Sequence, residues 1–464
     1  MLKKILFLWL LVSFSSHSVG QDISGSWTGI LEIQGSELPL ILNFTSSNGG
    51  YKGTMDSPKQ GAKEIPIDEV SFNNKQLTVK INAFAIEYIG EWKSNTEILG
   101  TFKQGNFSAP MHLKKGSFEI KKPQNPIEPY PYHTEKVEFK NTKENISLAG
   151  TLSLPKKEGK FPAVILISGS GQQNRDSEIL GHKPFLVISD YLTRNGIAVL
   201  RYDDRGVGQS KGDPTHSTSA DFANDAAGAI EYLRSRKEID SKKIGVIGHS
   251  EGGMIAPMLS ANDKNIAFII LLAGPGVSGD VLLLDQNYEV GKKQGLSEND
   301  LQEAKILNQK IYNIIKSEKD LAEMKKSLTA VLQTEMEKLP EAERPSKNEI
   351  EKSINEQVDG MTVPWLRYFI SYDPHENLKK TKCPVLVLNG EKDIQVTAKL
   401  NTEAITKALH EGKNKNVQVQ IFPNLNHLFQ HCTACNVAEY SQIEETFSSE
   451  VLKTMSDWIH KQIK

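Results

Sequence analysis

A serine in the pentapeptide Gly248-His-Ser-Glu-Gly252 carries the strongest chemical signal in this sequence. The pentapeptide matches G-x-S-x-G, and it stands between an apolar run at 244–247 and a helix-forming segment. A turn this sharp needs small residues two positions either side of the serine, because larger side chains would collide there. Ser250 is therefore predicted to be a nucleophile, exposed on a strained turn between a strand and a helix.

A serine becomes an effective nucleophile only beside a base that takes its proton, and the base needs an acid that orients it. Asp393 follows the apolar run 385–389, and His427 follows the run 417–422. Their order along the chain, serine then aspartate then histidine, is the order expected behind a G-x-S-x-G turn. We predict that His427 takes the proton of Ser250 and that Asp393 orients His427.

Each partner has one competitor nearby in the sequence. Glu391 competes with Asp393 in the same turn, but Asp393 is preferred because it matches the G-x-x-D pattern of such turns. His431 competes with His427, which lies closer to the end of its strand, whereas His431 lies beside the cysteines.

An anionic intermediate on the substrate oxygen needs two backbone N–H donors. One is predicted to come from Glu251, the residue after the nucleophile. The other is predicted to come from Ser170 in the glycine-rich loop 168–172, with Gln172 as the alternative. This chemistry requires no metal ion and no cofactor, so we expect neither.

The elements that position these residues alternate between strands and helices from about residue 133 onward. Each predicted strand is a nearly continuous apolar run, as expected for strands buried on both faces. The sequence therefore predicts an α/β domain with a mostly parallel sheet covered by helices on both faces. The predicted strands are 163–168, 197–202, 244–247, 267–272, 385–389 and 417–422.

The alternation is interrupted between about 277 and 380 by charged helical sequence. Two helix-start signals lie in this stretch, Ser297-x-x-Asp300 and Ser346-x-x-Glu349. The pattern predicts a helical cap inserted between two strands. A surface elaboration without any part in binding is the alternative.

The N-terminal part has a different composition. Residues 1–20 read as a signal peptide, with two lysines before a short apolar run and small residues at the end, which predicts a periplasmic or secreted protein. Residues 21–116 contain roughly eight short alternating runs, which predict an antiparallel all-β domain, either a lipocalin-like barrel or a sandwich. The four prolines within 117–132 predict an extended linker before the α/β domain, 133–464.

Composition limits the partners. The chain has 464 residues, 24% of them charged, and a formal net charge of −2, so nothing favours nucleic acid. The only long apolar run is too short to span a membrane, and the sequence does not indicate an oligomeric state. Three cysteines cannot form a disulfide framework, but Cys432 and Cys435 are spaced for a small disulfide. A zinc site with His427 and His431 is the alternative.

Several segments together resemble bacterial α/β-hydrolase esterases of the serine aminopeptidase (S33-like) group, from about Val137 to the C-terminus. The resemblance implies an α/β-hydrolase fold that cleaves the esters of small molecules. In the loop from Asp203 to Ser210 we interpret the acidic and basic residues as a network that braces the floor of the active site. The segments that carry the resemblance are Ile167-Ser-Gly-Ser-Gly, Arg201-Tyr-Asp-Asp-Arg-Gly-Val-Gly-Gln-Ser210, Gly248-His-Ser-Glu-Gly-Gly and Leu425-Asn-His-Leu-Phe.

Two other functions compete with ester hydrolysis. A serine nucleophile serves peptidases as well, so an exopeptidase that acts on small peptides or amides is the first rival. A binding protein with an inactive hydrolase scaffold is the second, and the complete set of serine, histidine and aspartate argues against it.

Overall fold

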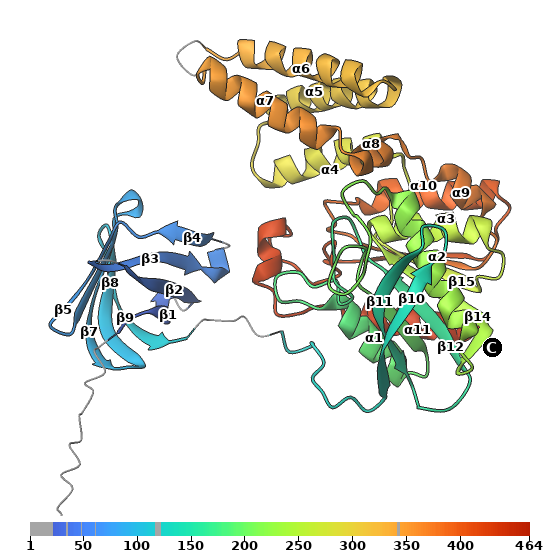
Figure 1. Cartoon of the computed structure of the whole chain (residues 1–464), viewed down its shortest axis with the longest axis horizontal. Helices are drawn as coiled ribbons and strands as arrows, with labels where there is room; N and C mark the ends of the chain where they lie inside the picture. The colour runs from blue at the N-terminus through green and yellow to red at the C-terminus, as the bar shows by residue number, and fades with distance from the viewer. Residues whose placement is uncertain (1–21, 34–35, 48, 61, 117–121, 341–343) are drawn as a thin grey trace, which may run out of the picture. The chain divides into compact units, whose positions relative to one another are not determined.

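The computed structural model describes residues 22–464 except 34–35, 48, 61, 117–121 and 341–343 (Figure 1). The predicted signal peptide, 1–20, lies outside the described residues. The chain divides into two compact units, residues 1–120 and 121–464, and each is described here by itself. Among the described residues, no helix has both the length and the apolar character needed to cross a bilayer.

The described part of the first unit is an all-antiparallel sheet of nine strands in the order β4-β3-β2-β1-β9-β8-β7-β6-β5. Its inward-facing side chains alternate with exposed ones and form one core around Trp27, Tyr88 and Trp92. The Trp27 indole N–H donates to the Ile23 carbonyl at 2.7 Å, which satisfies its one polar group in the core. The strands are β1 Gly25–Ile33, β2 Ser36–Ser47, β3 Gly50–Ser57, β4 Ala62–Pro66, β5 Glu69–Asn73, β6 Gln76–Ile81, β7 Ile86–Ser94, β8 Glu97–Gln104 and β9 Phe107–Lys115.

The second unit contains a mixed sheet in the order β10-β11-β13-β12-β14-β15-β16-β17. From β13 to β17 all neighbours are parallel, whereas β11 runs antiparallel to both β10 and β13. The parallel strands therefore end at one edge of the sheet. The strands are β10 His133–Asn141, β11 Ile146–Leu154, β12 Phe161–Ile167, β13 Ala198–Tyr202, β14 Ile239–His249, β15 Phe268–Leu272, β16 Val385–Gly390 and β17 Val417–Phe422.

Helices cover both faces of this sheet (Figure 1). Helices α1 and α11 contact each other on one face, and α2 and α3 pack together on the other. These helices bury apolar residues against the strands in one continuous core. Their bounds are α1 Pro184–Arg194, α2 Ser219–Ser235, α3 Glu251–Asn262, α10 Ala398–Glu411 and α11 Ser449–Gln462.

Helices α4 to α9 form the insertion between β15 and β16, as the sequence predicts. Ser297 and Ser346 each start a helix with a full capping box, which confirms both predicted helix starts. Part of the insertion has its own core, and α8 also contacts α2. The bounds are α4 Gly279–Lys293, α5 Glu298–Ser317, α6 Leu321–Glu337, α7 Lys347–Met361, α8 Pro364–Ser371 and α9 His375–Lys380.

The segment that we expected to be an extended linker is in part bound to the second unit. The Gln124 amide donates to the Phe447 carbonyl at 2.9 Å and accepts from the Phe447 N–H at 2.9 Å. The Lys122 ammonium donates to the Ser441 carbonyl at 3.2 Å. The prolines suggested a free spacer, but these hydrogen bonds attach the segment to the second unit. From Lys122 onward the segment therefore belongs to that unit.

Candidate active site

Ser250 lies between β14 and α3 with φ 54° and ψ −119°, a conformation that non-glycine residues rarely adopt. Its N–H donates to the Leu272 carbonyl at 2.9 Å, and its own carbonyl accepts from the Gly253 N–H at 2.8 Å. Hydrogen bonds on both sides thus hold the turn in its strained form. Such strain persists only where the surroundings enforce it, and it is typical of functional sites.

The two glycines of the pentapeptide are required by close backbone contacts. A Cβ at Gly248 would lie 1.9 Å from the Gly252 carbonyl oxygen, and a Cβ at Gly252 would lie 2.2 Å from the Ile167 carbonyl oxygen. Backbone cannot yield as a flexible side chain does, so no larger residue fits at either position. The second contact also fixes the start of α3 against the end of β12.

His427 and Asp393 lie together at the same edge of the sheet. His427 Nδ1 is 2.8 Å from Asp393 Oδ2, and both side chains are buried. The other oxygen, Oδ1, accepts from the N–H groups of Gln395 at 2.8 Å and Val396 at 2.9 Å. A carboxylate held in this way keeps the proton of His427 on Nδ1, which leaves Nε2 as the nitrogen that can take a proton.

His249 connects the turn of Ser250 to His427. Its Nε2 is 2.9 Å from the His427 carbonyl oxygen, and the two imidazole rings lie 4.8 Å apart. Burial, helped by the neighbouring His427, lowers the pKa of His249 to about 4, so this ring is neutral at pH 7. Because a carbonyl only accepts, His249 Nε2 is the protonated nitrogen and donates this bond. His427 is thus anchored to His249, the residue before Ser250.

Ser250 and His427 are not hydrogen-bonded to each other; in the part of the chain that the structure describes, no bond joins the serine hydroxyl to the imidazole. Catalytic contacts are often long before substrate binds and shorten in the complex. The structure therefore brings the predicted acid and base into contact, and it places the predicted nucleophile next to the histidine that holds the base.

The two competitors are directed elsewhere. Glu391 is exposed, accepts from the Asn424 N–H at 3.2 Å, and is paired with Lys392. His431 is also exposed and is bonded to Glu445 at 2.8 Å. Neither side chain is hydrogen-bonded to Asp393 or His427.

The loop after β12 lies beside the nucleophile. A Cβ at Gly169 would be 3.1 Å from Ser250 Cβ, so only glycine lets the loop come this close without a shift. Glu251 is the first residue of α3, and within the described residues its N–H donates no hydrogen bond. Ser170 and Gln172 follow Gly169 on this loop, and both are exposed. The predicted donors therefore lie on the two segments that border Ser250.

A cavity of about 230 Å³ lies beside the turn. Gly169, Gly171 and Gln172 of the loop border it, together with Glu251 at the start of α3. Trp365 reaches it from α8 of the insertion and donates to Glu251 Oε1 at 2.9 Å. The insertion thus contributes to the wall of the site, which argues against a purely surface role. The sequence did not predict a role for the Glu251 carboxyl or for Trp365. The two residues lie far apart in the chain, so no local sequence pattern connects them.

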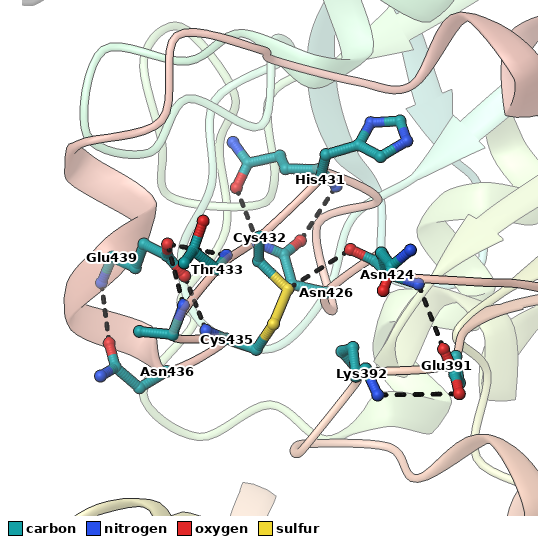
Figure 2. The surroundings of a disulfide bond; sticks show 12 residues. Glu391, Lys392, Asn424, Asn426, His431, Cys432, Thr433, Cys435, Asn436 and Glu439 are labelled. Atoms are coloured by element: carbon teal, nitrogen blue, oxygen red, sulfur yellow. Dashed lines mark hydrogen bonds and ion pairs between the residues drawn. A yellow bond between two sulfur atoms is a disulfide. The ribbon is translucent and has the colours of Figure 1, made fainter.

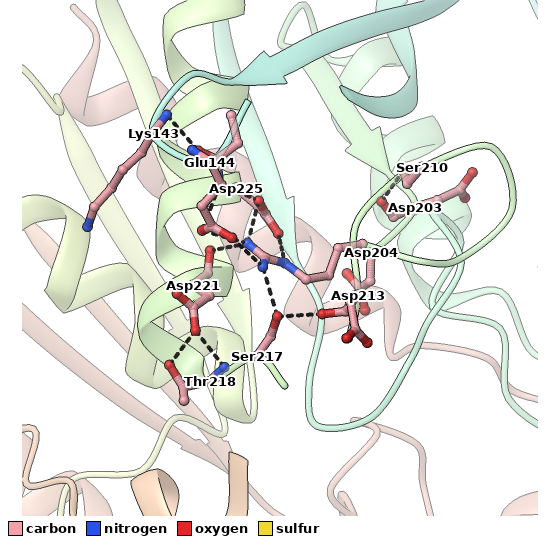
Figure 3. Close-up of polar contacts among 12 residues, drawn as sticks. Lys143, Glu144, Asp203, Asp204, Ser210, Asp213, Ser217, Thr218, Asp221 and Asp225 are labelled. Carbon is pink, nitrogen blue, oxygen red and sulfur yellow. Dashed lines mark hydrogen bonds and ion pairs between the residues drawn. The ribbon is translucent and has the colours of Figure 1, made fainter. Parts of the chain in front are cut away.

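The loop that begins at Asp203 contains the expected network of acidic and basic residues. Arg205 is buried and donates to Asp225 from Nε at 2.7 Å and to Glu144 from Nη1 at 2.8 Å, surrounded by the polar groups in Figure 3. Arg175 pairs with Asp203 in the same way. Asp204 borders the cavity, and it differs from these carboxylates because it accepts only from neutral groups, including the Ser168 hydroxyl at 2.8 Å.

The two neighbouring cysteines form a disulfide, Cys432–Cys435 (Figure 2). Glu439 holds the loop closed, because its carboxylate accepts from the N–H groups of Thr433 at 2.9 Å and Cys435 at 2.6 Å. Both sulfur atoms are bonded to each other in the disulfide, so neither cysteine is a free thiolate that could bind zinc together with His427. Disulfides are typical of proteins in oxidising compartments.

A comparison with known protein families decides which family this site belongs to. The sequence model described as serine aminopeptidase, S33, matches residues 185–431, more than half of the chain. The chain belongs to the serine aminopeptidase (S33) family. With the sheet order and the strand-turn-helix around Ser250, this membership establishes an α/β-hydrolase fold.

Similar individual proteins include two from bacteria. The esterase EstD of Thermotoga maritima is 28% identical over 61% of this chain, and the aligned part spans 58% of EstD. A 31.7 kDa Escherichia coli protein from the traX-finO intergenic region is 24% identical over 68% of this chain and 96% of its own length. Among solved structures, the Pyrococcus furiosus esterase Pf2001 shares 18% identity with a TM-score of 0.43, covering 75% of this chain and all of that one.

The contact between Gly252 and Ile167 yields a first prediction. Replacing Gly252 with alanine should abolish the activity of the site and lower the thermal midpoint by several degrees, because Cβ pushes α3 away from β12. Gly360 is the matched control, since it lies inside α7 and a Cβ there meets nothing within 4 Å. Gly360→Ala should leave the midpoint unchanged or raise it slightly. Equal thermal midpoints for the two variants in calorimetry would contradict this account.

Asp204 yields a pH prediction. Burial raises its pKa to about 7, against an ordinary value of 3.8, so the folded protein retains a proton that the unfolded chain releases. Its contribution to stability is therefore full below about pH 4 and is lost as the pH rises through 7. Asparagine does not titrate, so Asp204→Asn should not show this loss. The thermal midpoint of the variant minus that of the original protein should therefore rise between pH 5 and pH 8. A difference independent of pH would contradict the raised pKa.

Proposed function

We propose that the protein hydrolyses carboxylic esters of small molecules through an acyl-enzyme intermediate on Ser250. The observation that carries the proposal is the His427–Asp393 hydrogen bond at 2.8 Å, anchored through His249 to the strained turn that holds the serine. Membership of a serine hydrolase family supports it. The name of EstD, an esterase, favours esters as the substrate.

The reaction proceeds in two displacements. Ser250 Oγ attacks the ester carbonyl carbon while His427 Nε2 takes the hydroxyl proton. The bond between the carbonyl carbon and the alcohol oxygen then breaks, and His427 gives that proton to the leaving alcohol. A water molecule next attacks the acyl carbon and gives its proton to His427. The bond to Ser250 breaks, the serine recovers its proton, and the carboxylic acid leaves. Asp393 stabilises the imidazolium in both halves without itself taking the proton.

Negative charge develops on the carbonyl oxygen in both steps. We assign its stabilisation to the N–H of Glu251, which is free at the start of α3, and to the N–H of Ser170 on the neighbouring loop. The positive end of the α3 dipole acts on the same oxygen. Loss of one such donor commonly reduces kcat by a factor of about 100 to 1,000.

An exopeptidase that cleaves small amides is the second candidate, because the same nucleophile serves both reactions. The observation that favours it is the acidic character of the cavity, where Asp204 and Glu251 offer a place for a free amine. Rates on p-nitrophenyl acyl esters and on amino-acid p-nitroanilides separate the two functions. Rapid cleavage of the anilides beside none of the esters would replace the first proposal by the second.

The proposed roles predict a sharp division among nearby residues. Ser250→Ala and His427→Gln should each lower kcat on p-nitrophenyl butyrate by about 10⁴ or more, because each removes a group that takes part in bond making. His431→Gln and Glu391→Gln are the matched controls, since they remove the competing histidine and carboxylate. Both controls should stay within about threefold of the original kcat. A large loss in either control, with activity kept in His427→Gln, would refute the assignment.

A further inference from the structure

The carboxyl group of Glu251 is buried in an unusual state. The residue is 2% exposed, and Oε1 accepts from the Ser219 hydroxyl at 2.6 Å and from the Trp365 indole N–H at 2.9 Å. The other oxygen, Oε2, makes no hydrogen bond, although the nearby Ser170 hydroxyl acts to lower the pKa of the carboxyl. A buried polar atom without a partner is destabilising, so its presence in a native protein needs an explanation.

Glu251 borders the 230 Å³ cavity beside Ser250, and so does Asp204. Burial raises the pKa of both carboxyls, and the negative charge of Glu251 raises that of Asp204 further. Arg205 is the only cation among the residues that line the cavity, but each of its guanidinium nitrogens already donates to other groups. Among the residues that line the cavity, no side chain donates a hydrogen bond to Glu251 Oε2.

The rest of the cavity wall is part polar, with Ser168, Gln172, Tyr202 and Asp225, and part apolar, and the volume is small. Phe222, Ile255 and Trp365 contribute apolar surface, and Pro214 adds to it. Pockets for drug-sized ligands usually measure about 300–1,000 Å³, so this one fits a short chain only. Its chemistry is that of a small cavity with both apolar and polar walls, in which Asp204 and Glu251 offer carboxyl acceptors.

We propose that this cavity receives the acyl group of the substrate and selects acyl groups with a hydroxyl or amino group, whose hydrogen Glu251 Oε2 accepts. The inference rests on the proposed ester hydrolysis and adds the substrate class. Discrimination arises because a donor-bearing acyl group gives Oε2 the hydrogen bond that it lacks, whereas an acyl group without a donor leaves Oε2 unpaired.

The test compares kcat/KM on three p-nitrophenyl esters with the same carbon chain, those of butyrate, 3-hydroxybutyrate and 3-aminobutyrate. Each rate is divided by the rate of alkaline hydrolysis of the same ester, which removes differences in intrinsic reactivity. At least one donor-bearing ester should exceed butyrate by about tenfold or more. Preference for the hydroxy ester identifies a neutral donor, and preference for the amino ester identifies an ammonium group. Either result supports the proposal, and equal rates on all three overturn it.

Glu251→Gln tests the acceptor itself. The variant has nearly the same shape but places an amide at the end of the side chain, so it should lose at least most of the preference. Glu391→Gln is the control, because it neutralises an exposed carboxylate outside the cavity and should keep the preference. A preference that survives unchanged in Glu251→Gln overturns the proposal.

The readout is a ratio measured on one enzyme sample, so partial unfolding lowers both rates and leaves the ratio intact. If Glu251→Gln is inactive on all three esters, the proposal is judged on the original protein alone, by its kcat/KM on the donor-bearing esters relative to butyrate. Failure of the underlying function looks different, because the original protein then cleaves none of the esters, butyrate included.

Discussion

The backbone of Gly252 passes so close to the Ile167 carbonyl that a Cβ would lie 2.2 Å from its oxygen. This close approach lies between the end of β12 and the start of α3, and Ser250 is held on either side by hydrogen bonds to Leu272 and Gly253. The loop after β12 also lies beside the serine, where a Cβ at Gly169 would be 3.1 Å from the Ser250 Cβ. Ser250, the N–H of Glu251 and the glycine-rich loop are thus brought together by close approach of backbone segments.

The carboxylates of the site fall into two groups according to their partners. Glu144 and Asp225 are neutralised by Arg205, and Asp203 is neutralised by Arg175. Such pairs brace the loop but leave no charge for substrate. Asp204 and Glu251 receive hydrogen bonds only from neutral groups, so they retain a polarity that the cavity can use. Asp225 also lines the cavity, so what distinguishes Asp204 and Glu251 there is that no cation among the described residues is paired with them.

The sequence predicted the parts of the molecule that local pattern specifies. The central strands could be predicted because burial on both faces requires continuous apolar runs, as in β15 and β16. The capping boxes at Ser297 and Ser346 marked helix starts directly. The contact between Asp393 and His427 follows from their positions after neighbouring parallel strands, because such strands end at one edge of the sheet.

Features that depend on distant residues were missed. Strand β10 alternates exposed and buried residues at the edge of the sheet, so it lacks a continuous apolar run. The anchoring of Gln124 to Phe447 joins residues far apart in the chain, and proline content concealed it. The acidic cavity had no signal either, because the sequence indicated a role only for the backbone N–H of Glu251 and none for its carboxyl. Only the structure shows that its side chain is buried, with hydrogen bonds from Ser219 and Trp365.

Covalent labelling is the sharpest test of whether Ser250 is an activated nucleophile. The full chain is treated with a fluorophosphonate, which phosphonylates only activated serines, and the labelled peptide is identified by mass spectrometry. The account predicts one label per chain, on Ser250, and a much slower reaction in His427→Gln. Absence of labelling in the folded protein, or a label on a different serine, would contradict it.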